Sequence, residues 1–172
     1  AIVHAHMLAG RAMYRFDASA SGAPTITWRQ ACDRGSQLKP GQLSQGSGTP
    51  PTLVGGDLVA ITDNADPRMN VIFYNRGTGQ ELCQASVFTA GASDTENSVV
   101  AVGNSVIVEN NYGYAGPQST LLGRTTSPGI ARVQAVGGGT CNVMWTSQET
   151  APTSEPKVSL ASGLLYVYTK PK

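Results

Sequence analysis

The sequence predicts an all-β protein that is built from repeated four-stranded antiparallel units. Charged residues make up only 13% of the 172 residues, while 20 glycines and 10 prolines accompany many Ser, Thr and Asn residues. This composition is typical of short strands that are joined by tight turns, and it leaves few residues that favour helices. Two kinds of hairpin also alternate along the chain, which indicates an internal repeat.

The first kind of hairpin joins a short apolar strand, a turn of small and polar residues, and a strand rich in β-branched or aromatic residues. It occurs three times, at residues 49–64, 96–111 and 155–170. Glycines in the turns, such as Gly55 and Gly103, supply the positive φ angles that hairpin turns require.

The second kind of hairpin lies between copies of the first, at residues 13–28, 70–88 and 131–145. We label the strands of the first kind A and B, those of the second kind C and D, and residues 1–7 a leading B strand. The chain then reads (B)CD, ABCD, ABCD, AB. Because four-stranded units of this kind are the blades of β-propellers, we predict about three blades of a partial ring, with a β-sandwich as the alternative.

The blade-like units divide one continuous segment, residues 1–172, at approximately 1–48, 49–95 and 96–150, with 151–172 starting the next unit. Propellers close with roughly four to eight blades, and an open arc leaves an unpaired strand at each end. We therefore expect either self-association that completes the ring or the missing remainder of a longer chain. In self-association, the N-terminal strands of one copy complete the blade that residues 164–169 of the other copy begin.

Charge and hydropathy exclude two kinds of partner. The net charge is +1 and no basic run occurs, so no strong field recruits nucleic acid. The apolar stretches are strand-sized, far below the ~20 residues of a membrane span. The chain starts at Ala1 without a signal-peptide pattern, so we expect a removed signal or a start inside a longer protein. The low charge and the Ser, Thr and Gly content favour a secreted or periplasmic location.

Three cysteines occur, Cys32, Cys83 and Cys141, and their spacing is not that of a zinc site. Cys83 and Cys141 lie near the starts of D strands in successive units. A disulfide joins them if their Cα atoms come within roughly 7 Å, and Cys32 then remains free. The alternative is that all three are free, buried cysteines.

The second hairpins resemble the repeat of quinoprotein-like propellers, in which a segment of the form YxxDxxTGxxxW follows the B strand. Three segments carry the resemblance: Tyr14 to Trp28 with Asp17 and Gly22, Phe73 to Gly79 with Cys83 near the usual tryptophan position, and Gly137 to Trp145. The resemblance implies a propeller fold but no particular activity. Family members that bind pyrroloquinoline quinone carry adjacent cysteines, whereas the cysteines here are widely separated, so we do not expect that cofactor.

In a propeller, the D–A and B–C connections lie on one face, so loops that are distant in sequence share a rim. The candidate ligand-binding residues in these connections are Asp63, Asn64, Asp66, Asp94, Glu96, Asn97, Glu109, Asn110, Asn111, Tyr112 and Lys170. Their oxygen atoms suit Ca²⁺ or the hydroxyls of a sugar-like ligand, on which Tyr112 or Tyr114 would stack. The alternative is that these residues only shape turns by bonding to their own backbone.

A transition-metal site is a separate hypothesis. His4 and His6 share one face of the leading strand, and two imidazoles can reach one ion. No third histidine exists, so Glu109, Asp63 or Asp66 would have to complete the site, and Glu109 is the residue that we assign with the two histidines. The simpler interpretation is a pair of ordinary hydrogen-bonding histidines.

Two functions follow from these observations. The first is a scaffold or binding domain whose rim recognises a small polar ligand or a protein partner. The second is a secreted enzyme, a hydrolase, lyase or oxidoreductase, with an acidic and metal-assisted site on the same rim. The sequence contains no GxSxG motif, P-loop or dinucleotide fingerprint after a strand, so no catalytic residue is assigned.

Overall fold

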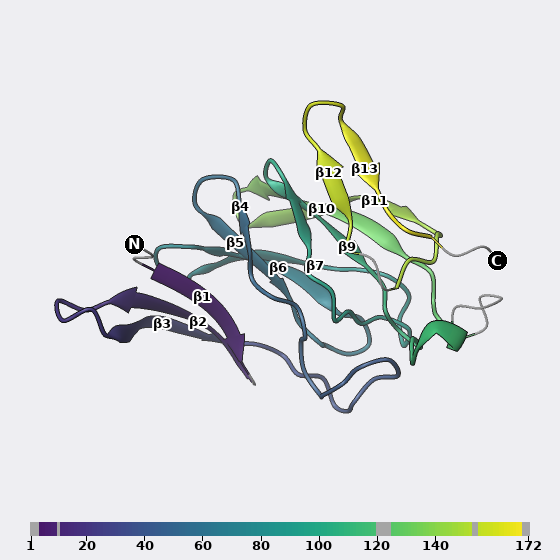
Figure 1. The fold of residues 1–172 in the computed structure, drawn as a ribbon, viewed down its shortest axis with the longest axis horizontal. Coiled ribbons are helices and arrows are strands. Elements are labelled where there is room, and N and C mark those ends of the chain that lie inside the picture. Colours follow the sequence, from purple (N-terminus) through teal and green to yellow (C-terminus); the bar gives the residue numbers. More distant parts are fainter. Residues whose placement is uncertain (1–3, 10, 120–124, 153–154, 170–172) are drawn as a thin grey trace.

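The computed structural model describes residues 4–9, 11–119, 125–152 and 155–169 (Figure 1). These residues form thirteen β-strands and one short 3₁₀ turn at Pro117–Ser119, and they contain no α-helix. The prediction of an all-β protein is therefore confirmed. None of the described elements is a helix that is long and apolar enough to cross a membrane.

The strands form four open antiparallel sheets that follow one another along the chain. The first sheet contains β1 (His4–Ala9), β2 (Ala12–Ala18) and β3 (Pro24–Ala31). The second contains β4 (Thr52–Val54), β5 (Leu58–Thr62), β6 (Asn70–Asn75) and β7 (Glu81–Ser86). The third contains β8 (Val100–Val102), β9 (Ser105–Glu109), β10 (Ile130–Gly137) and β11 (Thr140–Ser147). The fourth contains β12 (Lys157–Ser159) and β13 (Leu164–Tyr166).

The second sheet is buried on both of its faces. Successive residues of a strand point to opposite sides, so one strand contributes side chains to both faces. On one face, Val59 and Ile61 of β5 pack in a cluster with Trp28 of the first sheet. On the other face, Ala60 of β5 packs in a cluster with Val106 of the third sheet. Strands that are buried on both sides carry nearly continuous apolar runs, as the sequence of β5 and β6 shows.

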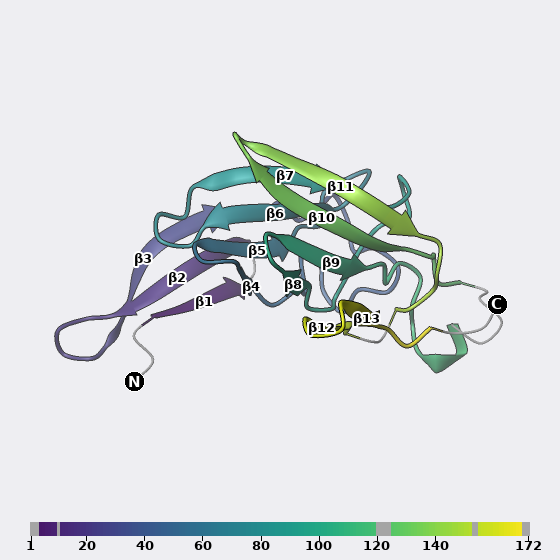
Figure 2. The same cartoon turned by 90° about the horizontal axis from the view of Figure 1, so that it is seen from above.

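The third sheet repeats this arrangement. Its Val106 and Val108 face the second sheet, whereas Ile107 packs in a cluster with Val158 and Leu165 of the fourth sheet. The four sheets therefore stack face to face in chain order, each against the next, rather than as two facing layers. Figure 2 shows the first strands β4, β8 and β12 along one edge of the stack and the last strands β7 and β11 along the other.

A disulfide joins Cys83 of β7 to Cys141 of β11, and the two Cα atoms lie 5.5 Å apart. It connects the outer strands of the second and third sheets, so the predicted pairing is confirmed. Cys32 is the free cysteine, and burial raises the pKa of its thiol. The disulfide is consistent with an oxidising extracellular or periplasmic location.

Candidate functional site

The long connections between strands gather at one end of the stack. Figure 1 shows the turns of the β4–β5, β8–β9 and β12–β13 hairpins along the upper side and the long connections along the lower side. We call this second end the rim. It consists of the described residues of five segments: 32–51, 63–69, 87–99, 110–129 and 148–156.

Backbone hydrogen bonds hold these segments together across the sheets. The amide of Asn64 donates to the carbonyl of Asp33 at 3.0 Å, and the amide of Asn111 donates to the carbonyl of Asp94 at 2.9 Å. Each bond joins the residue two positions beyond a B strand to the loop that follows the preceding D strand. The rim is therefore a repeated feature of the fold, as the pooling of D–A and B–C connections predicted.

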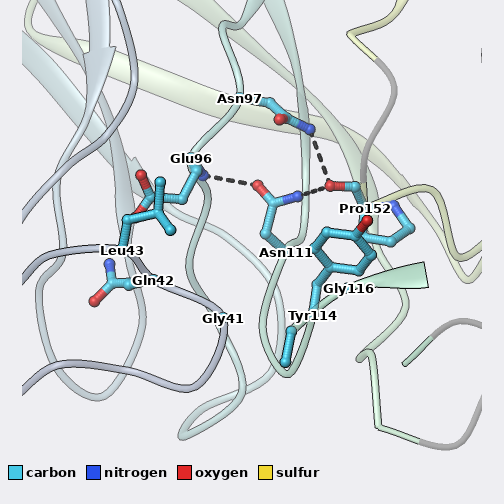
Figure 3. A pocket seen from close by; sticks show the side chains of 10 residues that line it. Gly41, Gln42, Leu43, Glu96, Asn97, Asn111, Tyr114, Gly116 and Pro152 are labelled. Carbon is cyan, nitrogen blue, oxygen red and sulfur yellow. Dashed lines mark hydrogen bonds between the residues drawn. The ribbon is translucent and has the colours of Figure 1, made fainter. Parts of the chain in front are cut away.

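The side chain of Asn111 is a hydrogen-bonding centre within the rim. Its Oδ1 accepts from Thr95 Oγ1 at 2.6 Å and from the amide of Glu96 at 2.7 Å. Its Nδ2 donates to the carbonyl of Pro152, to which Asn97 Nδ2 also donates at 3.2 Å (Figure 3). These bonds fix three loops from different sheets relative to one another.

Asn64 has the corresponding role one unit earlier. Its Nδ2 donates to the carbonyl of Arg34 at 2.8 Å, and its Oδ1 accepts from Gln42 Nε2, also at 2.8 Å. The carboxamide of Asn110 is likewise engaged, because its Nδ2 donates to the carbonyls of Ala92 and Pro128. For these two asparagines, the loop-shaping alternative describes what the side chains do.

A pocket of about 510 Å³ opens beside Asn111 on the rim (Figure 3). Its walls come from the loop after the first sheet, the loop after the second sheet, the insertion after β9 and the loop after the third sheet. The lining residues are Gly41, Gln42, Leu43, Glu96, Asn97, Asn111, Tyr114, Ala115, Gly116 and Pro152. Three predicted ligand-binding residues, Glu96, Asn97 and Asn111, thus meet at one cavity.

Two glycines allow the loops to approach closely enough to shape this pocket. A Cβ on Gly41, whose φ is +106°, would lie 2.6 Å from the carbonyl oxygen of Asn111. A Cβ on Gly48 would lie 1.8 Å from Oε2 of Glu96. Any side chain at these positions would displace the neighbouring loop or the Glu96 carboxylate.

Glu96 supplies the only carboxylate among the lining residues of this pocket. Its Oε1 is buried without a hydrogen-bond partner. Burial raises the pKa of this carboxyl above its ordinary value, and a hydrogen bond from the backbone of Leu43 opposes that rise. The lining contains no lysine, arginine or histidine, so the pocket offers acceptors and an aromatic ring rather than a cation.

Beneath the rim, Lys39 is buried with only 6% of its surface exposed. Its Nζ donates to the carbonyl of Ala65 at 2.7 Å and to the carbonyl of Ser93 at 3.1 Å. It also lies 3.7 Å from a carboxylate oxygen of Asp66. Lys39 therefore fastens the 32–51 loop to the loops of the second sheet.

Asp94 is completely buried, and neither of its carboxylate oxygens has a hydrogen-bond partner. Burial raises its pKa to about 7, with the positive charge of Lys39 lowering it and the negative charge of Glu96 raising it. A carboxyl with such a pKa exchanges its proton near neutral pH. It does not line the pocket, so its effect on a ligand would pass through Glu96.

The two remaining aspartates of the candidate set differ in their partners: Asp63 bonds within its own loop, and Asp66 bonds to the 32–51 loop. Asp63 Oδ1 accepts from the amide of Asn70 at 2.6 Å, and its Oδ2 accepts from Asn70 Nδ2 at 2.8 Å. Burial still raises its pKa above the ordinary value. Asp66 is exposed, and hydrogen bonds from Ser36 lower its pKa. Asp63 therefore closes the β5–β6 turn, whereas Asp66 anchors the 32–51 loop.

Glu109 lies at the end of β9 with 1% of its surface exposed, and its Oε2 accepts from Asn97 Nδ2 at 3.1 Å. The equivalent residue of the second sheet, Thr62, contacts Thr49, with 2.5 Å between the two Oγ1 atoms. In both sheets a polar residue that ends the B strand thus bonds a polar residue that precedes the A strand. Glu109 is packed inside the rim rather than open to it.

The predicted metal set does not converge in the structure. The ring of His6 lies 5.5 Å from that of Trp28, and its Nε2 lies 3.3 Å from the carbonyl oxygen of Arg76. His6 therefore faces the second sheet, whereas Glu109 lies between the third and fourth sheets. The side chain of His4 is outside the described part of the chain. Among the described residues, no three His, Cys, Asp or Glu side chains form a metal-binding cluster.

Tyr112 and Lys170 complete the candidate set. Tyr112 is half-buried and does not line the pocket, whereas Tyr114, two residues further along the same loop, does. Lys170 lies outside the described residues. The residue that sequence reasoning missed is Lys39, because a lysine in a polar loop is ordinarily solvated. Leu38 and Leu43 are the large apolar residues of this otherwise polar loop.

No protein-family model matches the chain, and no curated protein matches it.

Proposed function

We propose that the chain is a β-propeller-type binding domain, similar in its repeat to quinoprotein-like propellers, and that its rim pocket binds a small polyhydroxylated ligand such as a sugar. The stacking of the sheets supports the propeller. β8 contacts both β4 and β12, so the first strands of three successive units are neighbours, and the last strands β7 and β11 also meet. This arrangement is expected of blades that surround an axis with their first strands innermost.

The lining of the pocket is the observation that carries the proposed ligand class. Tyr114 contributes its aromatic side chain to this lining. Glu96 and Asn97 place acceptor oxygens in the same lining, while the amide of Gln42 is already engaged by Asn64 and Gly46. One aromatic face with a few fixed polar groups is the usual composition of a site for a small polar ligand.

We also propose that the protein is secreted or periplasmic. The support is the Cys83–Cys141 disulfide together with the low content of charged residues. Disulfides persist in oxidising compartments and are rare in the cytosol.

The test is calorimetric titration of the protein with a panel of neutral mono- and disaccharides. We expect at least one to bind, and Tyr114→Ala to weaken it by about two- to tenfold, because a stacking contact contributes about 0.5–1.5 kcal/mol. Tyr112→Ala is the matched control in the same loop and should keep the wild-type affinity. The proposed ligand class is wrong if no saccharide binds or if the two variants weaken binding equally.

A second candidate is an enzyme that uses the acidic rim. The observation in its favour is Asp94, because a carboxyl with a pKa of about 7 is typical of catalytic acids and bases. Both of its oxygens are buried, and Asp94 is not among the lining residues of the pocket. In this case, a saccharide that binds should also be hydrolysed or eliminated, and Asp94→Asn should abolish turnover but not binding.

A further inference from the structure

The outer faces of the first and fourth sheets present apolar side chains to solvent. On β1, Leu8 packs inward, so the neighbouring Met7 points outward, and it is 45% exposed. On β13, Leu165 packs inward, and the flanking Leu164 and Tyr166 are 53% and 55% exposed. The inner sheets differ in their central strands β5 and β9, which are buried on both faces, although the outer strand β11 also exposes apolar side chains such as Met144.

These two outer faces correspond to the two sides of a contact that the chain makes three times internally. Met7 of β1 is equivalent, by the strand repeat, to Ile61 of β5 and Val108 of β9. Those two residues lie on the face that meets the preceding sheet. Tyr166 occupies the position of Ile107 in β9, on the face toward the following sheet. The exposed face of the fourth sheet is thus equivalent to faces that meet a following sheet. The exposed face of the first sheet is equivalent to faces that meet a preceding sheet.

The first outer face also carries aromatic side chains. Tyr14 and Phe16 stack with their ring centroids 6.0 Å apart, and Arg29 lies 5.7 Å above the Tyr14 ring. Ile26 on β3 is paired with Phe16 and is 56% exposed. Contiguous apolar surface of this kind on a protein marks an interaction site rather than an isolated exposed residue.

We propose that two copies of this chain associate head to tail, with the outer face of the first sheet in each copy packed on the outer face of the fourth sheet in the other. A second copy is the occupant that the repeat favours, because each copy presents both halves of the internal sheet-to-sheet contact. Two such contacts continue the stacking across both chains and close it. In this arrangement the first sheet of one copy and the fourth sheet of the other stay separate sheets, unlike the shared blade that the sequence predicted. Eight sheets then surround one axis, within the range of known propellers.

The test is the mass of the purified full chain by light scattering after size exclusion, over a dilution series. We expect twice the 17.9 kDa of one chain, with dissociation on dilution. Met7→Lys and Tyr166→Lys should each give monomers, because each places a charge in an apolar contact. Met144→Lys is the matched control: Met144 is 49% exposed on the outer strand β11, and the variant should remain dimeric.

A mixing experiment separates this contact from a symmetric face-to-face dimer. The Met7→Lys chain keeps an intact fourth-sheet face, and the Tyr166→Lys chain keeps an intact first-sheet face. An equimolar mixture should therefore recover one native contact and form a heterodimer, while neither variant dimerises alone. A monomeric wild type, dimers that both substitutions leave intact, or a mixture that stays monomeric would overturn the proposal. Circular dichroism and thermal unfolding verify that each monomeric variant is folded.

Discussion

At the scale of single residues, the rim is defined by which polar groups are already satisfied. Asn64, Asn110 and Asp63 bond to neighbouring loops, so their polarity maintains the shape of the rim. Asp94 and Glu96 differ, because each has a buried carboxylate oxygen without a partner. An unsatisfied buried acceptor costs free energy, and proteins retain such groups where structure or function requires them.

The pKa of Asp94 predicts how stability depends on pH. The folded pKa is about 7 against an ordinary value of 3.8, so the folded state binds the proton more tightly. The stabilising contribution is complete below the unfolded pKa and is lost as pH rises through the folded pKa. The free energy of unfolding should therefore fall between those two values, by at most about 1.4 kcal/mol per pH unit for one proton.

Asp94→Asn should flatten this profile, because the variant has no carboxyl to ionise at that position. Urea unfolding of both proteins across the same pH range provides the measurement. Glu155→Gln removes an exposed carboxylate and controls for the loss of one negative charge. A wild-type stability that does not fall toward neutral pH would contradict the assigned protonation.

At the scale of elements, two features hold neighbouring sheets together: the 32–51 loop at the rim, and the disulfide between outer strands. The loop has no strand within it, and Lys39 fastens it through carbonyls of two other loops. The disulfide acts on the outer strands β7 and β11. Each is a link between sheets that strand hydrogen bonds cannot provide.

Lys39→Met should destabilise the protein by about 3 kcal/mol, because it leaves the carbonyls of Ala65 and Ser93 without a charged donor. The 32–51 loop should also become the first site of limited proteolysis. Lys157→Met, at a lysine whose side chain is 76% exposed, should change neither property. Equal stability of the two variants would show that the ammonium of Lys39 does not hold the loop.

Replacement of Cys83 and Cys141 by alanine should lower the free energy of unfolding by about 4 kcal/mol, as the chain-entropy estimate gives for a closed loop with a sequence separation of 58. Cys32→Ala should cost much less, since it removes no crosslink. Thiol titration of the unfolded wild type should find one thiol before reduction and three afterwards. Three thiols before reduction would contradict the bridge.

At the scale of the whole molecule, alternating hairpins were sufficient to predict the order of strands in all four sheets. Turn glycines and period-two apolar patterns are local signals, and each sheet is a local meander. The same alignment predicted that Glu96, Asn97 and Asn111 lie at one rim.

The remaining features depend on contacts between units, which no local pattern encodes. The path of the 32–51 loop, the burial of Lys39 and the absence of partners for Asp94 are properties of the packed loops. The structure separates two members of the metal hypothesis for the same reason: His6 lies on the face of β1 that meets the second sheet, whereas Glu109 belongs to the third sheet. The charges and the spacing of the residues in the sequence did not show which sheet would pack against each face of a strand.

The most direct test of the rim is a nuclear magnetic resonance titration of the ¹⁵N-labelled protein with the saccharide that binds most tightly in calorimetry. We predict that the largest amide shifts fall in three separate stretches, residues 41–43, 96–97 and 111–116, because they line one pocket. Loops that are far apart in the sequence would then respond to one small molecule. Shifts confined to a single stretch, or centred on the turns at the opposite end of the sheets, would contradict the shared rim.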